Sequence, residues 1–357
     1  ARAGDHPRRR PAIPRALGAP DVGQSVAARR APGLGSGYNT AMRDLSAAVS
    51  YALRTLPADI RLRPLDPLDH QSNHLYEARA GGAVYMVKEF RKPDELYDAP
   101  AREYFAMEAL APREIAPRPV AYVRAGQLGP GQWPIVVYQR MAGEMWDRRA
   151  PSAAEMGDLA RLWLAIHEVP VEGAPRARGI ADGAGRLLDR LPHVLQRYAD
   201  WAREAAPHCL PMARALEQVG SRAGAAAAEL RALPVREVYC RSDARFSNVI
   251  ARPDGRLGMV DWEDCGVGDP AQFMADLRVG PNQEDLISDA AWQSFSGLYL
   301  GALGRRDPTL ARRVALYELL VASLWLGWMA ERVLTDAAAG PVRPWAMNTM
   351  PATERGR

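Results

Sequence analysis

Residues 240–270, CRSDARFSNVIARPDGRLGMVDWEDCGVGDP, constrain this chain more than any other segment. Asp243 comes first, Asn248 follows five residues later, and Asp261 ends a short apolar run. Between the last two, a pair of apolar runs flanks Pro-Asp-Gly, a pattern typical of a β-hairpin. We therefore expect the hairpin to bring the three polar side chains to one end of a small sheet.

This set of side chains suits phosphoryl transfer. The reaction needs a carboxylate to orient and deprotonate an attacking hydroxyl, and an amide with a second carboxylate to hold magnesium on the nucleotide phosphates. The spacing matches the protein-kinase pattern of Asp, Asn and a later metal-binding Asp. It predicts Asp243 as the catalytic base, and Asn248 and Asp261 as Mg²⁺ ligands. A structural role for Asp243, as a turn cap, explains less of the segment.

The same segment resembles the aminoglycoside phosphotransferase family and its choline-kinase-like relatives. Their motif runs H-G-D, then Asn five residues later, then D-W-E or similar before G-x-G-D-P. The resemblance covers residues 60–333. It implies an α+β, bilobal protein-kinase-like fold. A small N-lobe would hold an antiparallel sheet and one key helix, and a larger, mainly helical C-lobe would hold the catalytic and metal-binding loops.

One position departs from the family pattern. Arg241 stands where the family has histidine, and Ser242 stands where it has glycine. In the family, that histidine packs beneath the metal-binding Asp and takes no part in proton transfer. Its replacement bears on local packing more than on chemistry. A nucleotide-binding pseudokinase without turnover is the alternative that this departure leaves open.

Lysine is almost missing from the chain. Of 46 basic residues, only Lys88 and Lys92 are lysines. Lys88 ends a β-rich run, from which a compact ammonium can approach nucleotide phosphates more closely than a forked guanidinium. Residues 85–88 also resemble the nucleotide-binding strand of the family, whereas Lys92 fits a surface position. We expect Lys88 to bind the nucleotide.

A lysine in that role needs a carboxylate to orient it. Residues 101–110 carry apolar side chains near helical spacing. Glu103 begins this predicted helix, as in relatives where such a glutamate meets the lysine, and Glu108 is the alternative. We prefer Glu103.

Two further parts of an ATP site follow from the resemblance. Residues 65–76 occupy the place of a phosphate-covering loop without its glycines, and the resemblance implies Ser72 and Asn73 as donors to phosphate oxygens. After the next apolar strand, backbone groups of Gln139 and Met141 are expected to pair with the adenine edge. The choice of ATP over GTP rests on the resemblance alone.

Acidic side chains dominate the segment after the metal-binding Asp. Residues 261–289 contain eight acids against one base, Arg278. Such a field concentrates a cationic acceptor and repels an anionic one. We expect a small cationic acceptor, such as an aminoglycoside or an amino alcohol. A neutral sugar, a fructosamine or an amino acid such as homoserine is the alternative, with the acids then a solvated loop. The residues expected to contact the acceptor are Glu263, Asp264, Glu284 and Asp285.

A chain of 357 residues can hold two lobes. Residues 1–41, rich in Arg, Pro, Gly and Ala, predict a disordered tail. Residues 42–140 would form an N-terminal helix and the N-lobe, residues 141–335 the C-lobe, and residues 336–357 a second tail. The first tail has seven arginines against two acids, enough to account for the formal net charge of +4. The charge therefore gives no reason to expect nucleic-acid binding.

The cysteines and the apolar runs bear on location. Cys209, Cys240 and Cys265 have no disulfide or metal-site spacing, so a cytoplasmic setting is expected. The longest apolar run, residues 316–330, contains Glu318 and predicts a core helix too short to cross a bilayer. We expect no membrane partner, and the oligomeric state is unknown.

Overall fold

The structure is a computed structural model that describes residues 36–65, 73–91, 98–146, 149–177, 186–205, 209–241, 243–281 and 283–339. Most of the two predicted tails lies outside these ranges. Helix α1 (Ser36–Leu53) begins before the predicted tail boundary at residue 41, and helix α8 (Leu310–Ala339) continues past the predicted C-lobe boundary at residue 335.

The N-lobe is a five-stranded antiparallel sheet in the order β1-β2-β3-β5-β4, with helix α2 inserted between β3 and β4. Its elements after α1 are η1 (Pro57–Asp59), β1 (Arg61–Pro64), β2 (His74–Ala80), β3 (Ala83–Glu89), α2 (Ala99–Leu110), η2 (Ala111–Arg113), β4 (Pro119–Val123) and β5 (Ile135–Gln139). The strand predicted before Lys88 and the helix predicted over residues 101–110 are both present.

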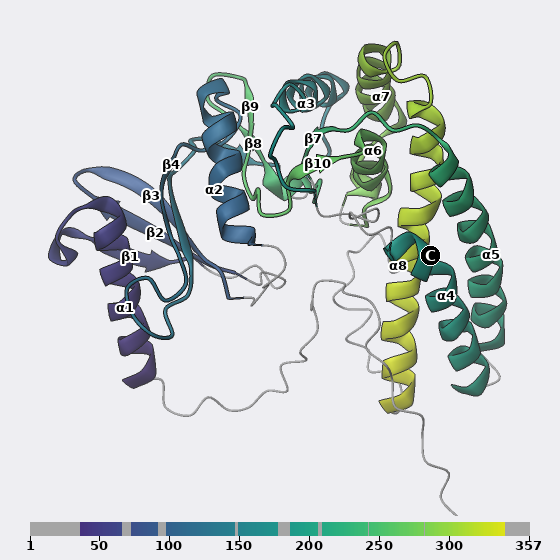
Figure 1. Ribbon diagram of the computed structural model, residues 1–357, viewed down its shortest axis with the longest axis horizontal. Coiled ribbons are helices and arrows are strands. Elements are labelled where there is room, and N and C mark those ends of the chain that lie inside the picture. Colours follow the sequence, from purple (N-terminus) through teal and green to yellow (C-terminus); the bar gives the residue numbers. More distant parts are fainter. Residues whose placement is uncertain are drawn as a thin grey trace, which may run out of the picture. The chain divides into compact units, whose positions relative to one another are not determined.

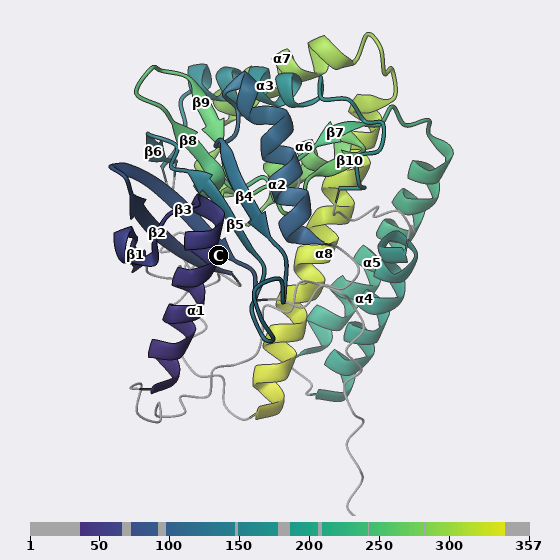
Figure 2. The ribbon, with the colours of Figure 1, turned by 60° about the vertical axis from the view of Figure 1, so that its left-hand side comes forward.

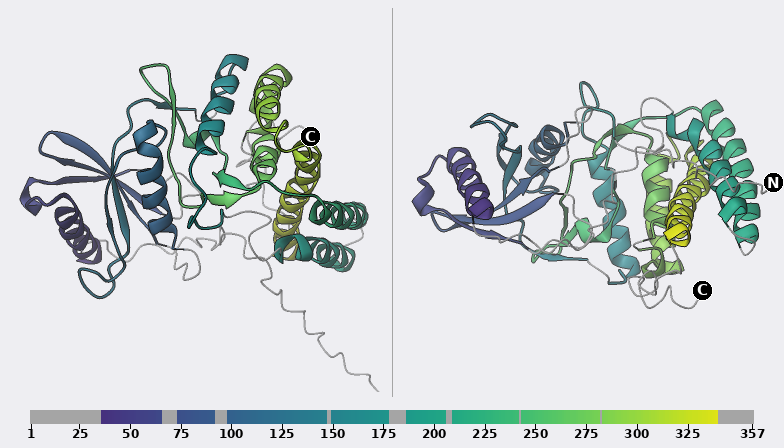
Figure 3. Two further views of the ribbon diagram at one scale, coloured as in Figure 1. Left: turned by 45° about the horizontal axis from the view of Figure 1, so that its top comes forward. Right: turned by 90° about the horizontal axis from the view of Figure 1, so that it is seen from below.

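Helices α1 and α2 cover opposite faces of this sheet (Figures 1 and 3). Successive side chains of a strand point to opposite faces. Along β5, Ile135 and Val137 join one buried cluster with Val49 of α1, whereas Val136 and Tyr138 join another with Met107 of α2. Because β5 is buried on both faces, its sequence is a continuous apolar run.

The C-lobe is mainly helical. Its elements are β6 (Glu144–Met145), α3 (Ala153–Ile166), α4 (Arg186–Ala205), α5 (Leu210–Ala232), β7 (Val238–Cys240), η4 (Phe246–Asn248), β8 (Val249–Ala251), β9 (Leu257–Met259), β10 (Gly266–Gly268), α6 (Pro270–Val279), η5 (Glu284–Leu286), α7 (Asp289–Leu303) and α8. Helices α4, α5 and α8 run side by side (Figure 2). Helix α3 packs against α7, and α6 packs against α8.

Two small sheets position the loops of the predicted site. The predicted hairpin is present as β8 and β9, with β6 beside β8 and Gly255 at a positive φ of +78° in the turn. Strand β7 pairs with β10. Asp243 and Asn248 lie on the segment between β7 and β8, and Asp261 lies just after β9.

Helix α8 is longer than the apolar run suggested from the sequence. Over Leu310–Thr335 it is long and apolar enough to span a bilayer, contrary to the prediction. In the fold it packs against α4, α5 and α6 and buries Leu320, Val321 and Leu334. It is therefore a core helix of the C-lobe, as expected.

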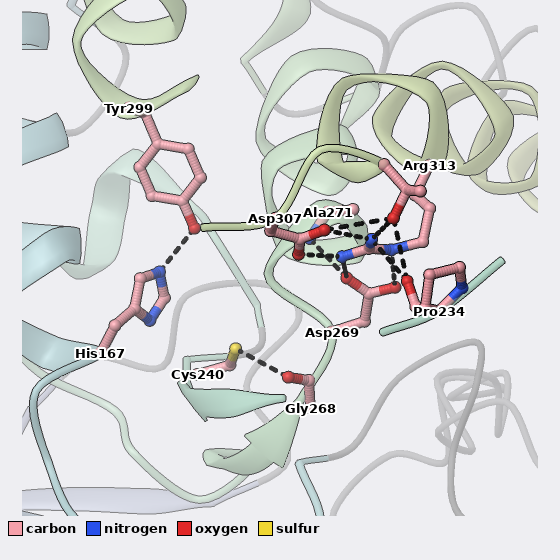
Figure 4. A network of polar contacts seen from close by, with 10 residues as sticks. His167, Pro234, Cys240, Gly268, Asp269, Ala271, Tyr299, Asp307 and Arg313 are labelled. Atoms are coloured by element: carbon pink, nitrogen blue, oxygen red, sulfur yellow. Dashed lines mark hydrogen bonds and ion pairs between the residues drawn. The ribbon is translucent and has the colours of Figure 1, made fainter. Parts of the chain in front are cut away.

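A buried ion-pair network fixes the start of α8 to the loop before α6 (Figure 4). Arg313 is fully buried and contacts Asp269 at 2.9 Å and Asp307 at 2.7 Å. Asp269 also caps α6 by accepting a hydrogen bond from Ala271 N at 3.0 Å. Since each charge is paired, removing one partner would leave another buried without compensation. The network holds the G-D-P turn that follows the predicted metal-binding loop.

His167, at the end of α3, is a buried neutral histidine. Its Nδ1 donates to Tyr239 O at 2.7 Å. Its Nε2 accepts from the Tyr299 hydroxyl at 2.5 Å, the contact drawn in Figure 4. Burial lowers the pKa of His167 to about 4 from 6.5, against the raising effect of the Tyr239 carbonyl. The histidine thus has the structural role that its helix-end position suggests.

This histidine should make the fold sensitive to acid. Because the pKa is lower in the folded state, the unfolded chain binds the extra proton between pH 6.5 and 4, and stability falls as the pH drops through that window. Denaturant unfolding should show that the parent loses about 2–3 kcal/mol more than His167→Asn between pH 7 and 4.5. His193→Asn, at an exposed position on α4, is the control and should keep the parental pH dependence. Equal dependence in parent and His167→Asn would contradict the account.

Candidate active site

Lys88 lies at the centre of a cluster of carboxylates from three segments of the chain. Its Nζ is 2.6 Å from Glu103 Oε2, 2.5 Å from Asp261 Oδ1 and 3.1 Å from Glu263 Oε2. Strand β3 supplies the lysine, α2 supplies Glu103, and the loop after β9 supplies the other two. Glu108, the alternative partner, is exposed on α2.

Burial and charge oppose each other in this cluster. The Lys88 and Glu103 side chains are only 6% and 0% exposed. Burial alone would lower the pKa of Lys88, but Asp261, Glu103 and Glu263 together raise it well above its usual value. Burial raises the pKa of Glu103 to about 7, although the Lys88 ammonium opposes that shift. Lys88 is therefore a fixed positive charge held by carboxylates.

The residues fit a divalent cation bound together with nucleotide phosphates. Oxygen ligands from Glu103, Asp261 and Glu263 lie within 4.8 Å of one another. Among the described residues, buried Glu103 Oε1 has no hydrogen-bond partner. Three carboxylates around one ammonium leave an excess of negative charge, and carboxylate oxygens are the ligands that Mg²⁺ prefers. The cluster therefore combines carboxylate oxygens that could hold a divalent cation with an ammonium that could contact phosphate oxygens.

Asp243 lies in the adjoining loop with both carboxylate oxygens engaged. Arg245 Nε is 2.7 Å from Oδ1, and Asn248 Nδ2 donates to Oδ2 at 3.2 Å. The Asp243 backbone has a φ of +57°, which is uncommon outside glycine. The predicted base and the predicted amide ligand are therefore direct neighbours.

The predicted base, Asp243, lies on the segment between β7 and β8 (the base loop), and Asp261 lies on the segment between β9 and β10 (the metal loop). A backbone hydrogen bond joins the two loops. Val260 N donates to Asn248 O at 3.0 Å, which places Asp261 beside the end of the base loop. Asp261 itself has a φ of +66°. Burial raises the pKa of this carboxyl, but Lys88 and Arg241 outweigh it, and the net shift is downward. Asp261 is thus held as a carboxylate, the form that binds a metal.

Glu263, expected from the sequence to face the acceptor, lies instead against Lys88. Besides contacting Lys88, it accepts a hydrogen bond from Asn73 Nδ2 at 2.6 Å. The reason is the residue between: Trp262 is fully buried and donates to Met259 O at 3.1 Å, so its two neighbours both turn toward Lys88. Asn73 is buried just before β2, and Ser72 lies outside the described residues.

The predicted adenine-binding segment follows β5. Gln139 N donates to Arg118 O at 2.9 Å and Arg140 N donates to Val84 O at 3.1 Å, so these two amides already have partners inside the N-lobe. Met141 packs on β9: a Cβ on Gly258 would lie 2.3 Å from its Sδ. The Gln139 amide is therefore not free to pair with an adenine edge in this structure.

The structure gives less detail for the other three acids that were expected to contact the acceptor. Asp264 is partly buried in the metal loop, and Asp285 is exposed on η5. The side chain of Glu284 lies outside the described part. Buried Gln283 donates to Ala244 O at 2.8 Å, so η5 adjoins the base loop.

Sequence analysis missed Arg245 and Asp276. Asp276 lies in α6, and its pKa is raised to about 6 by burial and by the charge of Asp243, against a hydrogen bond from Ala244 N. A signal existed: Asp276 follows the N-cap residue Asp269 by seven residues, so both lie on one helix face. Nothing in the sequence alone indicated that Arg245 would contact Asp243.

Comparison with known proteins agrees with this geometry. The model of the phosphotransferase enzyme family matches residues 65–312. Among solved structures, choline kinase LicA from Streptococcus pneumoniae shares 18% identity, with 86% of this chain and 95% of that chain covered and a TM-score of 0.54. Macrolide 2'-phosphotransferase MphH from Brachybacterium faecium shares 19% identity over 84% and 99%, with a TM-score of 0.52.

These matches confirm the α+β kinase-like fold and the resemblance drawn from the sequence. Because their identities are below 25%, the solved structures support the fold alone. The family model covers well over half of the chain and supports membership of the family. The chain therefore belongs to the phosphotransferase enzyme family, whose members are small-molecule kinases.

Proposed function

We propose that the protein transfers the γ-phosphate of ATP to a hydroxyl group of a small cationic molecule, in a magnesium-dependent reaction. One observation carries the proposal: buried Lys88 is held between Glu103 and Asp261, next to the loop of Asp243 and Asn248. Phosphoryl transfer is mostly positioning and charge stabilisation, and these groups supply both.

Each residue then has one role in the reaction. Lys88 donates to phosphate oxygens, with Glu103 fixing its position. Asn248 and Asp261 would hold the magnesium ion, which offsets the charge of the phosphates. Asp243 orients the acceptor hydroxyl and takes up its proton.

Adenine nucleotides suit the N-lobe of this fold. A second LicA structure, with a TM-score of 0.53, holds AMP, and APH(3'')-Id from Streptomyces rimosus, with a TM-score of 0.50, holds ADP and streptomycin. ATP is therefore the nucleotide that we propose, with the edge of β5 at Gln139 and Met141 as its base-binding segment.

The proposal of a cationic acceptor rests on the charge around the site. Asp264, Asp276 and Asp285 lie in the metal loop or on elements that follow it. Asp276 lies near enough to Asp243 for the Asp243 charge to raise the pKa of Asp276. These carboxylates favour an ammonium group near the reacting hydroxyl. Arg245, beside Asp243, is the opposing charge.

An acceptor screen at fixed Mg·ATP, read by mass shift, tests the proposal. The panel should pair charged and neutral acceptors of similar size: amino alcohols with diols, aminoglycosides with neutral oligosaccharides, and homoserine and a fructosamine as further members. We expect phosphorylation of amino alcohols or aminoglycosides ahead of their neutral partners. A neutral sugar as the best acceptor would contradict the charge argument, and Mg·ATP binding without any product would favour a pseudokinase.

The acidic residues outside the Lys88 cluster should govern acceptor affinity. Asp264→Asn with Asp285→Asn is expected to raise the KM of a cationic acceptor by a few-fold to about thirtyfold at low ionic strength, because each charge at or near the surface contributes about 0.2–1 kcal/mol. The KM of ATP should stay the same, and the effect should shrink as the Debye length falls to about 8 Å. Neutralising two distant exposed acids, Asp200 and Glu229, is the control. A KM for the cationic acceptor equal to the parent's at low ionic strength would rule out this role.

A further inference from the structure

Arg241, which departs from the family pattern, joins the two loops that carry the reaction. It follows β7 and is only 3% exposed. Its NH1 donates to Val260 O at 2.5 Å, and its NH2 donates to Asp243 O at 3.2 Å. One of these carbonyls belongs to the proposed base, and the other belongs to the residue just before the proposed metal ligand Asp261.

Both loops need an external support at these points. Asp243 and Asp261 each have a positive φ, at +57° and +66°. Non-glycine residues keep this backbone conformation only where their surroundings impose it. The bonds from Arg241 reach the backbone at Asp243 and one residue before Asp261, so they act where the two loops turn.

A guanidinium suits this double contact better than an imidazole. Arginine presents five N–H donors in a rigid fork and stays charged, whereas neutral histidine has one donor. The Arg241 guanidinium also lies 5.3 Å from the ring centroid of Trp262, which is fully buried between Asp261 and Glu263. The same side chain therefore contacts both loops and the tryptophan that directs the metal loop.

The charge of Arg241 acts on the same carboxylates. Burial lowers the pKa of Arg241, and Asp261 and Asp243 oppose that effect. In return, Arg241 is one of the groups that lower the pKa of Asp261, after Lys88.

We propose that Arg241 is a positioning residue that holds the base Asp243 and the metal ligand Asp261 in register for phosphoryl transfer. Its presence in place of the family histidine then preserves turnover. The inference rests on the proposed function, and it assigns to Arg241 no contact with substrate.

The test compares Arg241→Met, Arg241→His and Arg241→Lys in the full-length protein. We expect Arg241→Met to lower kcat by about 10²-fold, the usual loss when reacting groups are slightly misplaced, while the acceptor KM changes little. Its affinity for Mg·ATP should fall, and its affinity for ATP in EDTA should not. Arg241→Lys, which keeps the charge and can donate to one or both carbonyls, should recover kcat to within about tenfold of the parent. Arg241→His should fall between the two.

Arg102→Met is the matched control. Arg102 is also a buried arginine that donates to two backbone carbonyls, those of Arg176 and Cys265, outside the proposed machinery. We expect its loss to lower the melting temperature and to leave kcat within about threefold. All rates are measured well below each melting temperature, so that unfolding does not enter them.

The outcomes separate this inference from the proposed function. Parental kcat and parental Mg·ATP affinity in folded Arg241→Met would overturn the positioning role while leaving the kinase intact. If Arg241→Met does not fold, the test uses Arg241→Lys and Arg241→His instead. If the kcat values of these two variants fall only in proportion to the loss of melting temperature, the positioning role is overturned. If the parent phosphorylates no acceptor, the proposed function fails, and the Mg²⁺-dependent part of ATP affinity still reports on Arg241.

Discussion

Asp243→Asn is expected to lower kcat by about 10²–10⁴, the usual contribution of a positioned general base. Asparagine has nearly the same shape and can still accept hydrogen bonds through one oxygen, but it cannot take up the proton of the acceptor hydroxyl. Among the described residues, the Asp243 side chain contacts Arg245 and Asn248, whereas Lys88 contacts Glu103 and Asp261. The affinity for Mg·ATP should therefore change little.

Steady-state rates with the best acceptor, together with Mg·ATP titrations, measure both quantities. Asp254→Asn is the matched control: Asp254 is an exposed aspartate in the turn between β8 and β9 that contacts Arg252 and Arg256. It should retain the parental rate. If Asp243→Asn turned over within a few-fold of the parent, Asp243 would not be the base.

Asp261→Ala should fail in a different way, because it removes a magnesium ligand. We expect kcat to fall by about 10²–10³ or more, as when a preorganised charge contact is lost, and the gain in ATP affinity that Mg²⁺ confers to disappear. Lys88 would keep Glu103 and Glu263 as partners, so it should stay in place. The fold should therefore survive the substitution.

Calorimetric titration of ATP with Mg²⁺ and with EDTA separates the metal from the nucleotide. Asp264→Ala, three residues along the same loop, serves as the control and should keep the parental response to Mg²⁺. Equal Mg·ATP affinity in Asp261→Ala and the parent would remove Asp261 from the metal site.

Local patterns predicted the parts of the site that depend on sequence spacing. The Pro-Asp-Gly turn between two apolar runs predicted the hairpin that carries Asp261, and the shortage of lysine singled out Lys88. The preference for Glu103 over Glu108 rested on the resemblance to relatives in which a glutamate at the start of this helix meets the lysine. In each case the side chain's direction was set by its own strand or helix.

Side chains whose direction depends on distant packing were not predictable. Glu263 turns to Lys88 because Trp262 is buried in the core beside it, and no local pattern reveals that burial. The role of Arg241 depends on a carbonyl nineteen residues later, at Val260. Long-range contacts of this kind have no trace in spacing.

The central claim, transfer of an intact γ-phosphoryl group to an acceptor hydroxyl, is tested most directly with ATP carrying ¹⁸O on its γ-phosphate. The full-length protein is incubated with Mg²⁺, this ATP and the best acceptor, and the products are weighed by mass spectrometry. We predict that the acceptor gains one phosphoryl group with all of the non-bridging label, that EDTA abolishes the gain, and that Asp243→Asn slows it by at least about 10²-fold. Label that appears only in inorganic phosphate, or transfer by Asp243→Asn at the parental rate, would contradict the account.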